Sequence, residues 1–299
     1  MASGTRWLWG WRLVVAGAVL AGVGYAVVAL VAAERLTRPT VRPLRIDPSL
    51  VSRDVQPWSC RTEDGLILRG WYLPTPERTH LIVLVHGMWS SWIEMAPLGR
   101  DLHRRGFDVL LFDLRGHGQS DPSRLTMGRR ERSDLRAVLD WARRQGFQEE
   151  RIGWLGYSMG ASTLLLEAVR NPRIKVAVVD SPFGNLPVLL DDQLSKHSQL
   201  PSWFNPGILT AARHVFGVRT DDLVPIRAAR NWGKRPLLLI HGEADSIVPV
   251  SQARSLARAI GGSCLTMILP GVDHNQAYRS DPQSYVAVIE RFFREHLAP

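Results

Sequence analysis

The hydrophobic positions of this 299-residue chain fall into short runs separated by amphipathic stretches. From residue 80 onward, apolar runs of strand length lie near 81–85, 108–112, 151–155, 174–179, 236–240 and 264–269. Stretches with helical spacing lie near 92–105, 130–145, 159–170, 250–260 and 282–296. Strands that alternate with helices are typical of a parallel sheet covered by helices on both faces. The pattern therefore predicts an α/β fold with a mostly parallel central sheet.

Two intervals depart from this alternation. Residues 51–58 and 66–73 read as a strand pair around the turn Glu63-Asp64-Gly65, which would add two strands before the parallel ones. Between Asp180 and Lys234 the apolar and aromatic residues show no strand pattern. We expect an insertion there, over about residues 183–233.

The N-terminal region is dominated by an uncharged apolar stretch from Leu13 to Ala33. Its 21 residues are enough to cross a ~30 Å hydrocarbon core as a helix. Tryptophans precede it at positions 7, 9 and 11, where an interfacial aromatic belt would lie. A cleaved signal peptide is the alternative, although the run is longer than usual and no A-x-A site ends it. A buried core helix is a third reading, weakened by the absence of polar positions.

The favoured reading divides the chain into three parts. Residues 1–36 would be a single-pass membrane anchor, residues 37–49 a proline- and arginine-containing tether, and residues 50–299 the remaining domain. Two arginines precede the apolar stretch and four follow it closely, at 35, 38, 42 and 45. This positive-inside count favours a cytoplasmic domain by a small margin.

The stretch Gly156-Tyr157-Ser158-Met159-Gly160 carries the candidate chemistry. It follows a predicted strand and precedes a predicted helix, which is the context of a nucleophile elbow. A serine in so sharp a turn needs small neighbours, and the two glycines supply them. The hydroxyl would then stand at the positive end of the following helix.

A serine hydroxyl needs a base, and the base needs an orienting acid. Asp245 follows the strand near 236–240, and His274 follows the strand near 264–269. Both residues would lie in loops at the carboxyl ends of strands, in the order Ser, Asp, His. Asp180 is the rival acid, because it ends the sixth predicted strand. Asp273 adjoins His274 but would point elsewhere in a regular loop.

Two further motifs carry a family resemblance. His86-Gly87-Met88 follows the third predicted strand, and the stretch from Asp113 to Ser120 follows the fourth. With the elbow and the His274 loop, the chain from about residue 50 resembles the α/β-hydrolase superfamily, in its serine aminopeptidase and lysophospholipase-like branch. The resemblance implies an α/β-hydrolase fold and a small helical cap after the sixth strand. It also implies an oxyanion hole formed by the N–H groups of Met88 and Met159.

The resemblance also implies where substrate binds. Apolar residues of the cap would line the pocket, or simply pack the cap onto the body. We expect Trp203 and Phe204 of the cap to contact substrate, together with Trp89 and Tyr157, which adjoin the oxyanion and nucleophile positions.

Charge and composition bear on which partners, disulfides and metals the protein could have. The net charge is +9, and nearly all of the basic residues are arginines. This excess reflects either genome composition or attraction to an anionic membrane. No basic helix or binding motif accompanies the charge, so we expect no nucleic-acid partner. Two cysteines form no disulfide framework. No histidine spacing suits a metal, so we expect neither metal nor cofactor.

The sequence thus predicts a membrane-anchored serine hydrolase acting on small-molecule or lipid-like acyl esters, as a carboxylesterase, lysophospholipase or thioesterase does. A peptidase or amidase would use the same residues and is the first alternative. A non-catalytic, membrane-tethered binding protein is the second, although none of Ser158, Asp245 and His274 is lost. Oligomeric state is left open.

Overall fold

The structure is a computed structural model that describes residues 3–39 and 47–299. The chain divides into two compact units. We call Pro39–Leu189 with Thr220–Pro299 the sheet unit, and Met1–Arg38 with Leu190–Arg219 the helical unit. Most of the tether predicted over residues 37–49 lies outside the described residues.

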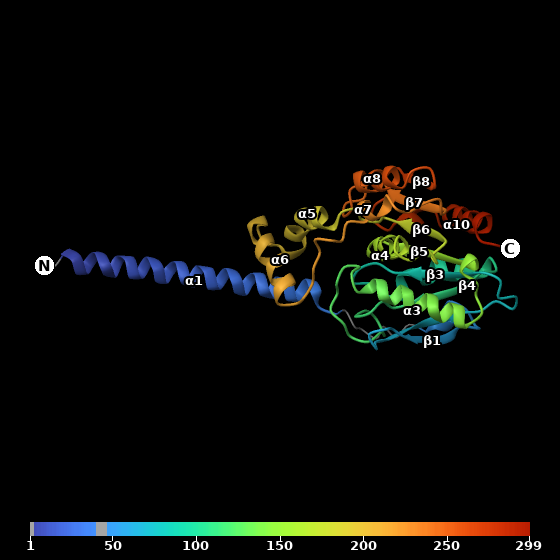
Figure 1. The fold of residues 1–299 in the computed structure, drawn as a ribbon, viewed down its shortest axis with the longest axis horizontal. Coiled ribbons are helices and arrows are strands. Elements are labelled where there is room, and N and C mark those ends of the chain that lie inside the picture. Colours follow the sequence, from blue (N-terminus) through green and yellow to red (C-terminus); the bar gives the residue numbers. More distant parts are fainter. Residues whose placement is uncertain (1–2, 40–46) are drawn as a thin grey trace. The chain divides into compact units, whose positions relative to one another are not determined.

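An eight-stranded sheet forms the centre of the sheet unit (Figure 1), in the order β1-β2-β4-β3-β5-β6-β7-β8. The strands are β1 (Gln56–Arg61), β2 (Ile67–Leu73), β3 (Leu81–Val85), β4 (Asp108–Phe112), β5 (Ile152–Tyr157), β6 (Val176–Asp180), β7 (Leu237–Gly242) and β8 (Cys264–Leu269). The β1–β2 and β2–β4 pairs are antiparallel, and all other pairs are parallel. The predicted mostly parallel sheet with an antiparallel edge is confirmed.

The start of the first strand differs most from the prediction. The strand begins at Gln56 rather than at residue 51, because Val51 ends the 3₁₀ turn Pro48–Leu50 in an αR conformation and donates its N–H to the Pro48 carbonyl. The Asp47 carboxylate accepts a hydrogen bond from Ser49 N–H and caps the start of this turn. Local turn bonds therefore delay the start of the strand.

Helices cover both faces of the sheet, as predicted. Residues of α2 (Trp92–Arg104) and α10 (Pro282–His296) join one core cluster with strand residues, and so share a face. Helices α3 (Glu131–Arg144), α4 (Met159–Ala168), α7 (Pro225–Ala229) and α8 (Val250–Ile260) pack in sequence on the other face. The short helix α9 (Ala277–Ser280) precedes α10, and a 3₁₀ turn (Glu149–Arg151) precedes β5.

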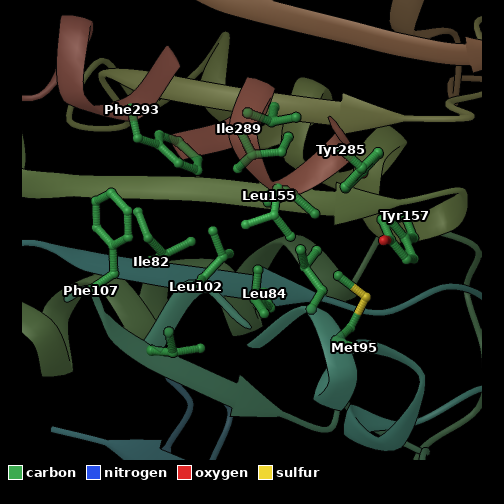
Figure 2. Packing of buried hydrophobic residues seen from close by; sticks show 14 of the residues in the cluster. Ile82, Leu84, Met95, Leu102, Phe107, Leu155, Tyr157, Tyr285, Ile289 and Phe293 are labelled. Carbon is green, nitrogen blue, oxygen red and sulfur yellow. The ribbon is translucent and has the colours of Figure 1, made fainter. Parts of the chain in front are cut away.

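The core beneath α2 and α10 fixes the central strands (Figure 2). Ile82 of β3 and Leu155 of β5 are fully buried there, against Ile289 and Phe293 of α10. A Cβ on Gly153 would lie 2.6 Å from Phe293, so the missing side chain lets this ring reach the sheet. Strand side chains alternate, so with Leu155 on this face, Gly156 lies on the α4 side.

The strand order reverses at β3, because the chain runs from β3 outward to β4 and returns to β5 on the other side of β3. In open α/β sheets, ligands bind at such a switch point, beyond the carboxyl ends of the strands. Here those ends lead into His86-Gly87 after β3 and Ser158 after β5.

The helical unit contains α1 (Ser3–Thr37), the later part of α5 (Leu186–Ser198), the 3₁₀ turn η3 (Ser202–Phe204) and α6 (Asn205–His214). Helix α1 packs against α6 (Figure 1). The predicted apolar N-terminal helix is present, and residues Trp9–Thr37 are long and apolar enough to cross a membrane. The insertion predicted over 183–233 is helical, and its residues 190–219 group with α1.

The assignment of Leu155 to the core predicts that shortening its side chain destabilises the protein far more than shortening an exposed one. Leu155→Ala should lower the free energy of unfolding by about 2–5 kcal/mol, because it opens a cavity in a rigid core. The matched control is Leu265→Ala on β8, where the side chain is 54% exposed and the cost should stay within about 0.5 kcal/mol. Urea unfolding of the detergent-solubilised protein measures both, and equal losses would contradict the assignment.

Candidate active site

Ser158 sits on a sharp turn between β5 and α4, in a conformation that few residues adopt. Its φ is 49° and its ψ is −113°, outside the regions usual for a side-chain-bearing residue. A Cβ on Gly156 would lie 2.7 Å from the Ala161 nitrogen, and a Cβ on Gly160 would lie 2.4 Å from the Val85 oxygen. The elbow therefore depends on both glycines, which lets α4 approach the sheet closely.

Three predicted residues meet at this turn. His274 Nε2 lies 2.9 Å from Ser158 Oγ, and His274 Nδ1 lies 2.7 Å from Asp245 Oδ2. Both distances suit hydrogen bonds, and they link hydroxyl, imidazole and carboxylate in one chain. Such a chain can move a proton from the hydroxyl to the imidazole while the carboxylate stabilises the charged ring.

Backbone donors hold Asp245 in place. Its second oxygen, Oδ1, accepts hydrogen bonds from the N–H groups of Ile247 (2.9 Å) and Val248 (2.7 Å). The neighbouring Asp273 accepts from Ser246 N–H and Oγ and from His274 N–H, so it fixes the two loops rather than the imidazole. As expected from the sequence, Asp273 points away from the ring.

Asp180, the rival acid, has other partners. Its oxygens accept hydrogen bonds from the Tyr285 hydroxyl (2.9 Å) and the Ser181 hydroxyl (3.0 Å). Complete burial raises the pKa of Asp180 to about 6. Its backbone oxygen accepts from Ser158 N–H at 2.9 Å, which ties the end of β6 to the elbow. The geometry thus gives Asp180 a place in the scaffold and Asp245 the contact with His274.

The loop after β3 lies directly against the nucleophile. A Cβ on Gly87 would lie 3.6 Å from Ser158 Cβ, so this loop and the elbow are in near contact. Met88 follows Gly87, and Met159 begins α4, where the first N–H groups of a helix have no acceptor within the helix. That their N–H groups form an oxyanion hole stays a prediction.

Two buried histidines hold this loop. Leu114 N–H donates to His86 Nε2 at 3.0 Å, and Trp89 N–H donates to His117 Nε2 at 3.3 Å. A ring nitrogen accepts only when it carries no proton. Burial lowers the pKa of both rings to about 4, so both are neutral at pH 7 and serve as acceptors.

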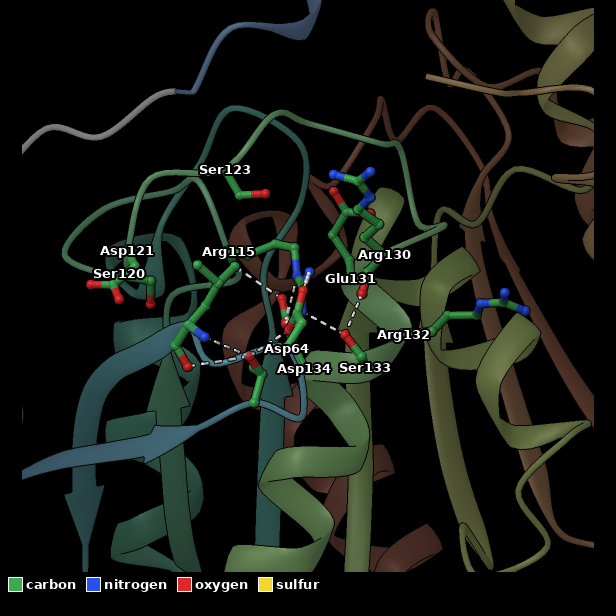
Figure 3. A network of polar contacts seen from close by, with 12 residues as sticks. Asp64, Arg115, Ser120, Asp121, Ser123, Arg130, Glu131, Arg132, Ser133 and Asp134 are labelled. Atoms are coloured by element: carbon green, nitrogen blue, oxygen red, sulfur yellow. Dashed lines mark hydrogen bonds and ion pairs between the residues drawn. The ribbon is translucent and has the colours of Figure 1, made fainter. Parts of the chain in front are cut away.

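The turn after β4 that carries His117 is fastened by a buried polar network (Figure 3). Arg115 is almost fully buried, and its guanidinium bonds Asp134 of α3 at 2.8 Å and Asp64 of the β1–β2 turn at 2.7 Å. Asp134 also accepts Arg115 N–H. The network connects the loop after β3, through His117, to α3 and to the β1–β2 turn.

Sequence reasoning missed Glu94, in the first turn of α2. Its carboxylate accepts Gly87 N–H at 3.0 Å and faces Asn275 Nδ2 at 3.5 Å. It also lines a pocket of about 250 Å³ beside the imidazole. The lining residues are Glu94, Tyr157, His274, Asn275, Gln276, Tyr278 and Arg279. The available signal was an acidic residue seven positions after Gly87.

The four residues expected to contact substrate divide between the two units. Tyr157 is buried and lines the pocket beside His274, while Trp89 is 36% exposed with a positive φ of 56°. Trp203 and Phe204 belong to the helical unit, where both rings stack on Tyr25. That these two residues line the substrate pocket stays a prediction.

No group of three or more His, Cys, Asp or Glu side chains that could hold a metal ion occurs in the described part of the chain. Both cysteines, Cys60 and Cys264, are free thiols.

Comparisons with known proteins agree with this architecture. Residues 76–231 match the family model described as serine aminopeptidase, S33. The uncharacterised protein YqkD of Bacillus subtilis is 26% identical over 234 residues, covering 76% of this chain and 75% of YqkD. The uncharacterised protein Rv2307c of Mycobacterium tuberculosis is 29% identical over 239 residues, covering 78% of this chain and 77% of its own length.

A solved structure supplies the fold. The Pyrococcus furiosus esterase Pf2001 superposes with a TM-score of 0.73 at 25% identity, covering 88% of this chain and 99% of the esterase. The α/β-hydrolase fold predicted from the motifs is thereby confirmed for this chain.

The neutral histidines predict a pH dependence of stability. Their pKa is about 4 in the folded protein, below the ordinary value of 6.5, so the unfolded chain takes up their protons first. Their contribution is complete above pH 6.5 and is lost as pH falls towards 4. His117→Gln keeps an acceptor for Trp89 N–H without titrating. Between pH 7 and pH 4, its Tm should fall less than that of the wild type, and parallel curves would contradict this.

Proposed function

We propose that this chain, which belongs to the serine aminopeptidase (S33) family of α/β-hydrolases, is a serine hydrolase that cleaves acyl esters. The family supports hydrolase activity at a general level. The observation that carries the finer proposal is the chain of contacts from Ser158 Oγ through His274 to Asp245, at 2.9 Å and 2.7 Å.

The mechanism follows from these contacts. Ser158 Oγ attacks the ester carbonyl carbon while His274 Nε2 takes the hydroxyl proton. The imidazolium is stabilised by the Asp245 carboxylate at Nδ1, and it then donates the proton to the leaving alcohol. Water, deprotonated by the same imidazole, attacks the acyl-serine, the bond to Ser158 Oγ breaks, and His274 returns the proton to Oγ as the acid leaves.

The oxyanion formed in each half-reaction needs donors that are already in place. We assign this role to the N–H groups of Met88 and Met159, because both lie beside the elbow and Met159 stands at the positive end of α4. His86 and His117 act indirectly, since their ring nitrogens hold the backbone around Met88.

The pocket beside the imidazole bears on the substrate. The leaving group must lie near His274 Nε2 to receive its proton, so the adjoining pocket is suited to the leaving group. Glu94 brings a carboxylate, a strong hydrogen-bond acceptor, to that pocket. The pocket therefore favours a leaving alcohol with further hydroxyl groups, such as the glycerol of a monoester.

An amidase or peptidase is the second candidate function. The family description names aminopeptidases, and the Glu94 carboxylate could pair with a substrate ammonium group. A panel of glyceryl, propyl and p-nitrophenyl esters against aminoacyl p-nitroanilides separates the two. Faster turnover of the anilides would replace the ester proposal.

Membrane attachment is the remaining part of the proposal. The apolar length of α1 and the tryptophans at positions 7, 9 and 11 support a single-pass anchor rather than a removed leader. A lipid-like ester would be available to an enzyme held there. More arginines follow the apolar stretch than precede it, which favours a cytoplasmic sheet unit by a small margin.

The acid assignment predicts unequal effects of two isosteric variants. Asp245→Asn should lower kcat roughly 10³–10⁴-fold, because the imidazole loses its orienting charge. Asp180→Asn keeps an acceptor for Tyr285 and should cost less than about tenfold. Steady-state hydrolysis of p-nitrophenyl butyrate, with circular dichroism to verify folding, measures both. Reversed effects in folded variants would transfer the acid role to Asp180.

The leaving-group assignment predicts a substrate-dependent effect of Glu94→Gln. The amide oxygen still accepts Gly87 N–H but carries no charge. The variant should lose roughly ten- to a hundredfold in kcat/KM for a glyceryl monoester, because hydrogen bonds to a charged group are the stronger ones. The loss for the propyl ester of the same acid should be at most a few-fold. Equal losses on both esters would mean that Glu94 acts only through the Gly87 loop.

A further inference from the structure

The anchor helix has two distinct halves. Residues 9–24 of α1 are all exposed, and after Arg12 they carry no charge. From Tyr25 onward, positions four residues apart become buried: Tyr25 partly, then Ala29, Ala33 and Thr37 almost completely. Side chains at four-residue spacing share one helix face. The second half of α1 is thus packed within the helical unit, while residues 9–24 are exposed.

The transition between the halves is made by Tyr25. Its ring stacks on Phe204 and Trp203, with centroid separations of 4.9 Å and 5.6 Å. Its hydroxyl donates to the Trp203 carbonyl at 3.2 Å and accepts Gly207 N–H at 3.1 Å. A Cβ on Gly207 would lie 2.5 Å from that hydroxyl, so the glycine makes room for the contact. Tyr25 therefore holds the start of α6 against α1 at position 25.

The distance along α1 from the N-terminal tryptophans to Tyr25 approaches the thickness of a hydrocarbon core. Sixteen residues separate Trp9 from Tyr25, which at 1.5 Å per residue is about 24 Å. A hydrocarbon core is about 30 Å thick, and aromatic residues gather at both of its interfaces. With the tryptophans near position 9 at one interface, the three stacked rings of Tyr25, Trp203 and Phe204 stand close to the other.

Trp203 itself is placed as an interfacial residue would be. Its side chain is 61% exposed although it is large and apolar, while its neighbour Phe204 is buried. Farther along α1, a groove of about 280 Å³ changes from an apolar wall at Val27, Val28 and Val31 to Arg35 and His197. Eight residues, or about 12 Å, separate Val27 from Arg35. Polarity rises in the direction that leads out of a bilayer.

We infer that the segment Ser202–Gly207 lies in the headgroup layer of the membrane that α1 crosses, with Trp203 inserted among the lipids. The inference rests on the proposed anchor and adds a second, cap-borne contact with the bilayer. The cap segment is then held at the lipid surface by both Tyr25 and Trp203. It also gives Trp203 a lipid partner in place of the substrate contact expected from the sequence.

Depth-dependent fluorescence quenching tests this placement in the full-length protein. Cys60 and Cys264 are replaced by alanine, and single cysteines are introduced as Trp203→Cys, Val19→Cys or Gln145→Cys. Each is labelled with the fluorophore NBD and reconstituted into phosphatidylcholine–phosphatidylglycerol vesicles. The vesicles carry a nitroxide either on the headgroup or at carbon 12 of an acyl chain. Val19 reports the middle of the anchor, and the exposed Gln145 reports the sheet unit.

We expect the label at position 203 to lose most of its emission to the headgroup nitroxide and little to the carbon-12 nitroxide. The label at position 19 should show the reverse, and the label at position 145 should respond to neither. Ser202→Cys repeats the measurement with Trp203 intact, which guards against a disturbed segment.

Two results would overturn the inference, and a third would overturn the anchor as well. A label at 203 that remains water-exposed, with 19 quenched by carbon 12, removes the cap contact and leaves the anchor. Blue-shifted emission at 203 without quenching by either nitroxide means that protein, such as a second copy of this chain, covers Trp203. A label at 19 that neither nitroxide quenches removes the anchor itself.

Discussion

Helix α4 approaches the ends of β3 and β5 so closely that neither Gly156 nor Gly160 could carry a side chain. The Val85 oxygen would lie 2.4 Å from a Cβ on Gly160, a distance at which the backbone itself would have to move. This approach produces the unusual backbone of Ser158, aims its hydroxyl at His274 and brings the Gly87 loop against the nucleophile. The Asp245 and oxyanion assignments both depend on it.

Much of this could be predicted from the sequence, because the decisive signals are local. The glycines on either side of Ser158, the strand before them and the helix after them lie within about twenty residues. Likewise, His274 and Asp245 follow apolar runs that can only be strands in a parallel sheet, and such loops meet at one edge. The choice between Asp245 and Asp180 is harder, since Asp180 ends one strand and Asp245 closely follows the end of the next. The contacts with Tyr285 and Ser181 separate them, and no local pattern reveals those contacts.

The features that sequence reasoning missed depend on tertiary contacts. Glu94 reads as an ordinary acidic residue at a helix start until Gly87 folds back onto it. For Trp203 and Phe204 the sequence did not show the stacking partner, because an aromatic pair indicates only that something apolar lies nearby. Their partner, Tyr25, is almost 180 positions away in a segment that looked like a uniform membrane helix. The start of β1 differs from the prediction because Val51, where the strand pattern begins, ends the preceding 3₁₀ turn.

The central claim is that Ser158 is a nucleophile activated through His274 and Asp245. Its most direct measurement is reaction of the purified full-length protein with a fluorophosphonate, followed by mass spectrometry of the labelled peptide. We expect one adduct, on Ser158, and labelling that is strongly slowed in His274→Ala. An adduct on another residue, or labelling of Ser158 at an unchanged rate in His274→Ala, would contradict it.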